Sequence, residues 1–348
     1  MLIIKESISN IIKVTIMGIK NLLKFLSDYP ELIKEKESSE YYGKKIAIDI
    51  SILMYQVVIA IRNSGSDLTN NKGEITSHIL GLFNKTLSFL EKGIIPIFVF
   101  DGKPPQLKQK ILDTRKQIRK KALEKLSDAQ NDADKIKYLK RSVLISKEQM
   151  NQCRELLNLM GIPYIDAPEE ADSELSYLCK SNLVYAVLTE DMDILTFGSP
   201  KIIRNLTSSK KTPIEIDLKQ VLSRLSITYE QFIELCILFG CDYCPNLIDI
   251  KYDTIFEIYI KHKNIEDTLE EIKKRNHIIP ENYEYKQAKQ YFMNSSHNIV
   301  NKEELKIKKP DTDKLIELLV NKYGLIKYKV INKLNRLNEL YLKFKIYE

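Results

Sequence analysis

The sequence predicts an α/β sheet core followed by a helical C-terminal portion. Short apolar runs typical of buried strands alternate with segments of helical periodicity over the first two thirds of the chain, whereas from Leu218 onward the periodicity is helical only. The last strand candidate, at residues 201–205, is expected at an edge of the sheet. The strand candidates span residues 44–50, 94–100, 162–165, 184–188 and 201–205, and the helices expected among them span residues 19–26, 51–62, 75–92, 149–160 and 169–180.

The stretch YAVLTEDMDIL at residues 185–195 shows where chemistry is expected. Its apolar run ends in Asp191 and Asp193, with Glu190 just before them. In an open α/β sheet the carboxyl end of a strand borders a ligand crevice, so two neighbouring carboxylates there require a cation. Carboxylate oxygens suit Mg²⁺ or Mn²⁺. Taken alone, the stretch is also compatible with a polar turn after a strand.

Carboxylates recur after other strand and helix candidates. Asp49 and Asp101 end two strands, and Asp242 follows the apolar helix at 229–239. Glu169, Glu170 and Asp172 follow Pro168, in the first turn of an expected helix. Their presence there can also be explained without a metal, because the helix dipole favours acids in the first turn. Gathered at one sheet edge, the whole set would require two divalent ions about 3.5–4 Å apart, which permit in-line displacement at phosphorus. The set is Asp49, Asp101, Glu170, Asp172, Asp191, Asp193 and Asp242.

A basic, helical segment at residues 103–147 directly follows Asp101. A charged run is usually a solvated helix face. Here its position behind a carboxylate at a strand end, together with the net charge of +7, favours a phosphate-binding element and an anionic partner such as nucleic acid. In its first half only Asp113 opposes Lys103, Lys108, Lys110, Arg115, Lys116, Arg119, Lys120 and Lys121.

Cysteine usage indicates a reducing intracellular compartment, and the sequence leaves the nucleus and a viral replication site both open. The five cysteines are scattered, and the CxxC of Cys241 and Cys244 lacks a second pair or histidines at ligand spacing, so neither a disulfide framework nor a structural zinc site is expected. No apolar run is long enough to span a membrane, and we expect no membrane partner.

Seven blocks of the sequence closely resemble, in order, those of XPG-type structure-specific nucleases, and flap endonucleases in particular. The similarity covers roughly Met17 to Tyr323. The blocks are MGIKNLLKFL, YYGKKIAIDIS, GEITSHILGLF, VFDGKPPQLK, LMGIPYIDAPEEAD, TEDMDILTFGSP and LCILFGCDYC.

The resemblance implies a PIN-like α/β nuclease domain with a helical arch, followed by a helix–two-turn–helix module of the 5′–3′ exonuclease C-terminal type that grips duplex DNA. On this basis we expect an N-terminal extension at 1–16 and the XPG N-terminal region at 17–122. The arch and XPG internal region of the same nuclease core are expected at 123–217, and the helical DNA-binding region at 218–348.

The resemblance also implies roles for individual residues. Lys108 and Arg115 are similar to the cations that steer the scissile phosphate, and Tyr55 to the aromatic on which a base of the frayed duplex end stacks, although Tyr55 also fits plain core packing. Arg62 and Lys85 fall where the family contacts the substrate backbone, and Gly240 where the chain passes close beside Asp242. The first-metal positions are Asp49, Asp101, Glu170 and Asp172, and the second-metal positions are Asp191, Asp193 and Asp242.

The implied reaction is two-metal hydrolysis at a 5′ flap junction of DNA, with 5′–3′ exonuclease activity, which leaves a 5′-phosphate. Two Mg²⁺ ions are the expected cofactors, with Mn²⁺ as a substitute, and flapped or nicked duplex DNA is the expected partner of a monomer. Shape and backbone contacts would provide selectivity. The alternatives are a gap, bubble or RNA-end nuclease of the same superfamily and a catalytically silent binder of DNA junctions.

Four features depart from the family pattern. Asp172 stands where the family usually has the longer Glu, and Asp249 and Lys251 replace glycines that let backbone amides approach a phosphate or a bound K⁺. Sixteen residues precede Met17, where the family usually begins and where its second residue packs near the active site, so we expect either translation from Met17 or an outward path for this leader. The end LKFKIYE lacks the family's sliding-clamp motif, so clamp binding through such a tail is not expected.

Overall fold

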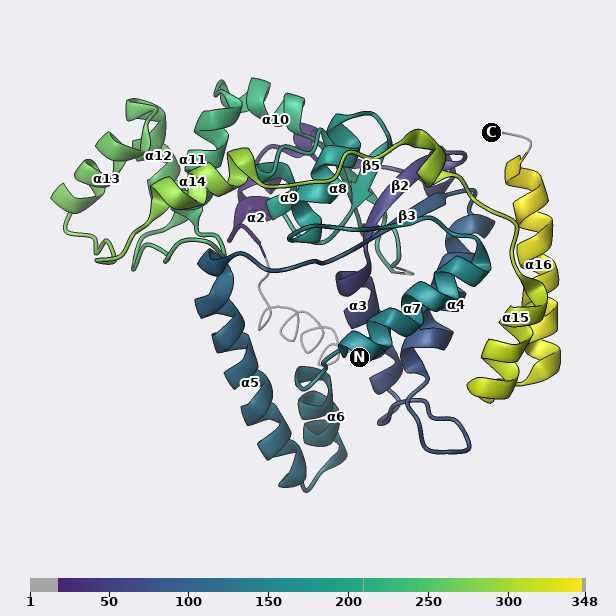
Figure 1. Cartoon of the computed structure of the whole chain (residues 1–348). Coiled ribbons are helices and arrows are strands. Elements are labelled where there is room, and N and C mark those ends of the chain that lie inside the picture. Colours follow the sequence, from purple (N-terminus) through teal and green to yellow (C-terminus); the bar gives the residue numbers. More distant parts are fainter. Residues whose placement is uncertain (1–17, 209, 346–348) are drawn as a thin grey trace.

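The chain forms a seven-stranded sheet within the described residues, 18–208 and 210–345, of the computed structural model (Figure 1). The strand order is β1-β7-β6-β5-β2-β3-β4, in which β6 to β4 are parallel and β7 and β1 are antiparallel to their neighbours. The N-terminal extension expected at 1–16 lies outside the described residues. The strands are β1 (Lys34–Glu35), β2 (Lys45–Asp49), β3 (Ile95–Phe100), β4 (Tyr164–Asp166), β5 (Ala186–Leu188), β6 (Lys201–Arg204) and β7 (Ile214–Asp217).

Helices surround the sheet and continue beyond it. Short 3-10 turns lie at 30–32, 38–41, 106–108 and 302–305, and a π-helical turn lies at 317–322. The helices are α2 (Leu22–Ser27), α3 (Ile50–Arg62), α4 (Ser77–Glu91), α5 (Gln109–Ser127), α6 (Asp132–Arg141), α7 (Lys147–Met160), α8 (Ala171–Lys180), α9 (Asp193–Thr196), α10 (Leu218–Leu225), α11 (Tyr229–Phe239), α12 (Tyr252–His262), α13 (Ile265–Lys274), α14 (Tyr285–Asn294), α15 (Thr312–Ile316) and α16 (Lys327–Lys345).

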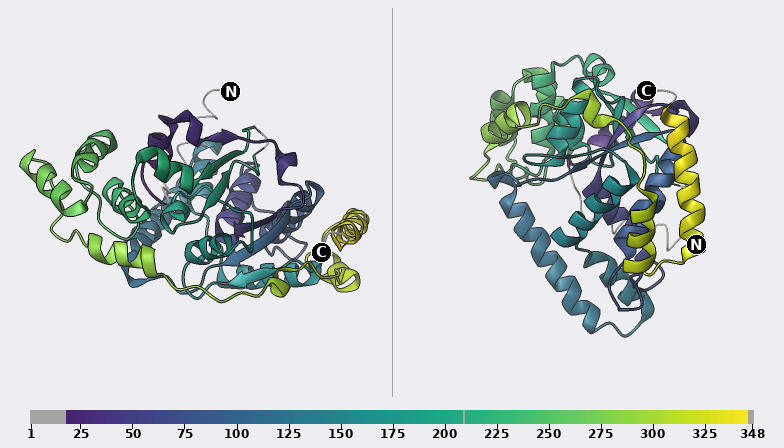
Figure 2. Two further views of the ribbon diagram at one scale, coloured as in Figure 1. Left: turned by 90° about the horizontal axis from the view of Figure 1, so that it is seen from above. Right: turned by 45° about the vertical axis from the view of Figure 1, so that its right-hand side comes forward.

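The central strands β5, β2 and β3 are apolar because both of their faces are covered by helices. The connection from β2 to β3 passes through α3 and α4, and the connection from β4 to β5 passes through α8 in the opposite direction along the sheet. Since such crossovers are right-handed, these helices cover opposite faces (Figures 1 and 2). The strand order therefore reverses next to β2, where α/β folds place their ligands.

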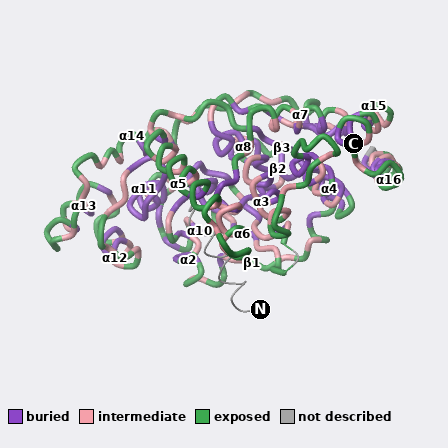
Figure 3. The backbone as a smooth tube through the Cα atoms, turned by 90° about the horizontal axis from the view of Figure 1, so that it is seen from below, coloured by how far each residue is buried: buried purple, intermediate pink, exposed green. Residues whose placement is uncertain are grey.

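The basic segment forms a helical hairpin that projects from the body of the protein. Helices α5 and α6 contact each other and descend together away from the sheet (Figure 1). Helix α5 is largely exposed and fully buries only Ala122, whereas most residues of α6 are half-buried (Figure 3). This hairpin corresponds to the arch that the sequence predicted.

The helical C-terminal portion divides into two packed groups. Helices α11 to α14 extend from one end of the sheet, and α15 and α16 pack beside α4 and α7 at the other end (Figures 1 and 2). An extended segment from Ser295 to Asp311 joins the groups and crosses α8 on the way, where Ser173 donates a hydrogen bond to the carbonyl of Ser296 at 2.9 Å. Among the residues that the structure describes, none of the helices has the length and apolar character that a membrane span requires.

Two local predictions were wrong. The strand at 201–205 was expected at an edge, but β6 is interior because β7, which the sequence pattern did not reveal, pairs antiparallel with it and β1 extends the sheet further. The helix predicted from residue 169 begins at Ala171, and Glu170 is its N-cap residue. The residues before Ala171 do not join the helix, because they pair with the segment after β3. The carbonyl of Glu169 accepts a hydrogen bond from the Gly102 amide, and that of Pro168 accepts one from the Lys103 amide.

Candidate active site

Three predicted carboxylates lie together because three neighbouring parallel strands deliver them to the same edge of the sheet. Asp49 is the last residue of β2, Asp101 follows β3, and Asp191 follows β5 after a short turn. Asp49 caps α3 by accepting the Ile52 amide at 3.0 Å. Asp101 accepts the Ser51 hydroxyl at 2.6 Å and the Ala171 amide at 3.0 Å, so it connects the beginnings of α3 and α8.

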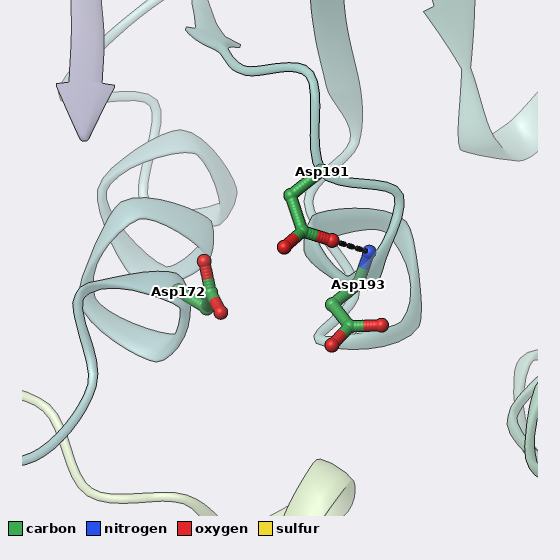
Figure 4. Close-up of side chains that lie close together, drawn as sticks. All are labelled: Asp172, Asp191 and Asp193. Atoms are coloured by element: carbon green, nitrogen blue, oxygen red, sulfur yellow. Dashed lines mark hydrogen bonds between the residues drawn. The ribbon is translucent and has the colours of Figure 1, made fainter. Parts of the chain in front are cut away.

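Asp172, Asp191 and Asp193 form the tightest group of acids (Figure 4). Each offers a carboxylate oxygen within 4.8 Å of the others, and all three are buried. Asp172 approaches from the first turn of α8, and Asp191 accepts the Asp193 amide at 2.9 Å. Both carboxylate oxygens of Asp193 are buried without a hydrogen-bond partner among the described residues. Buried carboxylate oxygens that converge from three residues, two of them without a hydrogen-bond partner, are a suitable ligand set for a hard divalent cation.

Gly18 is the close neighbour of this group. A Cβ atom at this position would lie 1.8 Å from Oδ1 of Asp191, and its φ of +83° is in the left-handed region. Only glycine satisfies both conditions. The second residue of the MGI block therefore lies against the acidic site, as the family resemblance led us to expect.

The arch supplies two cations to the remaining acids. Lys108, at the base of α5, donates from Nζ to Oε1 of Glu170, and the same Nζ lies 3.8 Å from Oδ2 of Asp242. Arg115 on α5 donates from Nη2 to Oδ2 of Asp242 at 2.6 Å. The second oxygen of Glu170 accepts the Tyr243 hydroxyl at 2.5 Å. The structure thus brings both predicted steering cations to the predicted acids.

Electrostatic interactions join the acids into one cluster. Burial, and then the charge of Asp101, raise the pKa of Asp49 well above its usual value. Burial and Asp191 do the same to the pKa values of Asp172 and Asp193. Burial alone would lower the pKa of Lys108, but the surrounding carboxylates outweigh it and raise that pKa.

The excess of negative charge adds to the effect of burial on these pKa values. Seven carboxylates against the two arch cations leave five excess negative charges when all are ionised. Such a cluster is stable in its ionised form only with further cations.

Of the residues predicted to bind substrate, four belong to this cluster, namely Lys108, Arg115, Glu170 and Asp242. The other four, Tyr55, Arg62, Lys85 and Gly240, lie outside it. Tyr55 is half-buried, about 9 Å along α3 from Asp49 at 1.5 Å per residue. Gly240, with a φ of +108°, lies where a Cβ would meet Oδ1 of Asn246 at 2.2 Å, so the close contact there is with Asn246. Lys85 on α4 donates to the Thr207 carbonyl at 3.3 Å.

Arg62, at the far end of α3, is already engaged. It makes a two-point ion pair with Asp67, with distances of 2.9 and 2.8 Å, and donates to the Leu139 carbonyl of α6 at 2.7 Å. These contacts connect the end of α3 to the arch. They give Arg62 a structural role in addition to the substrate contact expected from its position.

Two residues of the site were missed at the sequence level. Ser51 binds Asp101 and Tyr243 binds Glu170, over separations of 50 and 73 residues. Both lie within two residues of predicted acids, which is a weak signal because the pattern does not reveal the partner.

The backbone shows the effect of the two residues that replace family glycines, Asp249 and Lys251. Asp249 has a φ of +55°, the left-handed conformation that glycine adopts without cost, whereas Lys251 has an ordinary φ of −81°. The loop is connected to the segment after α13 by a hydrogen bond from the Ile248 amide to the Ile278 carbonyl at 3.3 Å.

Comparison with known protein families identifies the chain. The XPG N-terminal domain matches residues 17–155, and the XPG I-region matches residues 161–242. Flap endonuclease 1-A of Oryza sativa subsp. japonica is 43% identical over 316 residues, which cover 88% of this chain and 83% of the relative. The chain belongs to the XPG family of flap endonucleases. Human flap endonuclease 1 is 40% identical over 330 residues, covering 93% of this chain and 87% of the relative.

Solved structures agree with this membership of the XPG family. The flap endonuclease-1 from Methanococcus jannaschii superposes with a TM-score of 0.68 at 30% identity, covering 89% of this chain and 96% of that one. The catalytic core of Rad2 in complex with DNA substrate gives a TM-score of 0.71 at 23% identity, covering 92% of this chain and all of that one. The predicted family and its PIN-like α/β fold are therefore confirmed.

Proposed function

We propose that this XPG-family chain is a divalent-metal-dependent 5′ flap endonuclease and 5′–3′ exonuclease, which hydrolyses DNA phosphodiester bonds in replication and repair. The buried group of Asp172, Asp191 and Asp193, with unsatisfied oxygens on Asp193, carries the proposal. Sequence identity to flap endonucleases over most of the chain supports the choice of substrate.

The acidic cluster fits a pair of divalent cations, and we propose Mg²⁺, with Mn²⁺ as a substitute. Asp191, Asp193 and Asp242 would hold one ion, and Asp49, Asp101 and Glu170 the other. Asp172 falls on a first-metal position, with Asp49, Asp101 and Glu170, yet it lies against Asp191 and Asp193, so it could contribute to either ion. When bound, the two ions supply an activated water nucleophile and neutralise the charge of the reacting phosphate.

The protein's own residues would bind and orient the DNA. Lys108 and Arg115 can transfer from Glu170 and Asp242 to the oxygens of the scissile phosphate, because both side chains already reach the cluster from the arch. Tyr55 would stack on a base at the frayed duplex end. Lys85 and Arg62 would contact the sugar-phosphate backbone, and the loop that begins at Gly240 would approach the duplex.

Branched DNA is the proposed partner of a monomer. A related fold is known in complex with branched DNA, as in human GEN1 with Holliday junction DNA, which superposes with a TM-score of 0.68 at 18% identity. We keep the domain boundaries expected from the sequence, at residues 16, 122 and 217, as part of this proposal.

A substrate panel tests the proposed function. A 5′-labelled double-flap duplex is compared with nicked, gapped, bubble and single-stranded DNA and with RNA ends, with and without Mg²⁺. The proposal predicts metal-dependent incision at the flap junction, and loss of cleavage with retained binding in Asp191→Ala. Preferred cleavage of gaps, bubbles or RNA would favour the alternative nuclease, and binding of flaps without any cleavage in Mg²⁺ or Mn²⁺ would identify a junction binder.

A further inference from the structure

Glu170 is held from two directions by different parts of the molecule. Its Oε1 accepts Lys108 from the arch, and its Oε2 accepts the Tyr243 hydroxyl at 2.5 Å. Lys108 is buried in the cluster, but it lies at the base of the arch, whose helix α5 is largely exposed, and its ammonium is the group expected to turn to the DNA phosphate. The Tyr243 bond therefore remains as the fixed restraint on this carboxylate during substrate binding.

Tyr243 is itself immobilised by its surroundings. Its side chain is 2% exposed. Its ring lies 4.8 Å from that of Tyr291, 5.1 Å from that of Phe292 and 6.0 Å from that of Phe197. These neighbours come from α14 and from the end of α9, so the helical portion and the nuclease core both fix the ring. A hydroxyl held rigidly in this way sets the direction in which the Glu170 carboxylate points.

We propose that Tyr243 is a positioning residue that orients Glu170 for metal binding, a proposal that rests on the proposed function. The residue acts through Glu170 and does not touch the substrate. Substitution by Phe removes the hydroxyl and keeps the ring with its aromatic contacts, so the orientation is lost while the packing stays.

The chain contains a matched control outside the acidic cluster. In the helical portion the buried Glu234 accepts Lys289 at 2.6 Å and the hydroxyl of the buried Tyr259 at 2.8 Å. This Lys–Glu–Tyr arrangement has the same chemistry as the one at Glu170, but it holds α11, α12 and α14 together. Tyr259→Phe thus measures what the loss of such a hydroxyl costs in stability alone.

The test compares Tyr243→Phe and Tyr259→Phe in the full chain, by Mn²⁺ titration without DNA, by kcat and KM on the double flap, and by thermal unfolding. A hydrogen bond to a charged group accounts for about a tenfold change in an equilibrium. We expect Tyr243→Phe to bind Mn²⁺ about tenfold more weakly and to lose about tenfold in kcat with little change in KM. Tyr259→Phe should keep wild-type metal affinity and kcat despite a similar loss of thermal stability.

A second pair of variants tests the route through Glu170. Glu170→Ala and the double variant Glu170→Ala/Tyr243→Phe should bind Mn²⁺ equally, because the hydroxyl then has no carboxylate to orient. Wild-type Mn²⁺ affinity in Tyr243→Phe, or additive losses in the double variant, would overturn the inference. If the wild-type chain neither binds Mn²⁺ nor cleaves flaps, it is the proposed function that fails.

Discussion

Replacement of Gly18 by alanine should disable the site without unfolding the protein. The new Cβ would lie 1.8 Å from Oδ1 of Asp191, and ordinary contact begins at 3.4 Å, so the carboxylate must move by about 1.6 Å. Misplacement of a reacting group by about 1 Å can cost about 100-fold in rate, and we expect at least that loss of flap cleavage in Gly18→Ala. The positive φ of +83° adds about 1–2 kcal/mol of instability.

Gly43 is the control that separates the two effects. Its φ is +73°, yet no atom lies within 4 Å of a Cβ built there. Gly43→Ala should lose a similar amount of stability in urea denaturation while keeping wild-type cleavage and Mn²⁺ binding. Equal cleavage rates in Gly18→Ala and Gly43→Ala would refute the claim that Gly18 exists to make room for Asp191.

Four further predictions concern Asp172, the loop at Asp249 and His78. Asp172→Glu, which restores one methylene of reach, should alter both the rate and the Mg²⁺ concentration for half-maximal cleavage, and unchanged values would show that the shorter acid is equivalent. Because Asp249 holds a left-handed φ of +55°, Asp249→Gly should raise the free energy of unfolding by about 1 kcal/mol. Because Asp249 and Lys251 replace the glycines that would let the backbone approach a bound K⁺, cleavage by the wild-type chain should be independent of K⁺. Strong stimulation by K⁺ would show that the loop still binds this ion. Burial lowers the pKa of His78 below 6.5 despite its hydrogen bond to Gln152. The unfolded chain thus takes up this proton first as pH falls, and stability should decline below about pH 6.5 by up to about 1.4 kcal/mol per pH unit. His78→Gln should flatten this slope in denaturation at pH 5–7, whereas an unchanged slope would assign it to other groups.

The acidic cluster could be predicted because its physics is local to each strand. An apolar strand that ends in an acid, such as β2 at Asp49 or β3 before Asp101, is visible in the sequence, and parallel strands share a carboxyl edge. The arch was visible as a charged helical run with few large apolar residues. Both features depend on residue type and spacing within one continuous segment of the chain.

The remainder depended on contacts between distant segments. Nothing in the pattern indicates that Arg62 pairs with Asp67 and the Leu139 carbonyl, or that Tyr243 binds Glu170. The interior position of β6 was missed because β7 spans only four residues after a basic loop and was not recognised as a strand. Such features become visible only when the chain is folded, since local periodicity carries no information on the partner.

Diffraction from crystals soaked in Mn²⁺ tests the central claim most directly. If the acids form one metal-binding pocket, anomalous difference maps should show two peaks, one of them in contact with the carboxylates of Asp172, Asp191 and Asp193, and Asp193→Ala should remove or weaken that peak. The absence of anomalous density among these acids at saturating Mn²⁺, or peaks confined to other surfaces, would contradict the account.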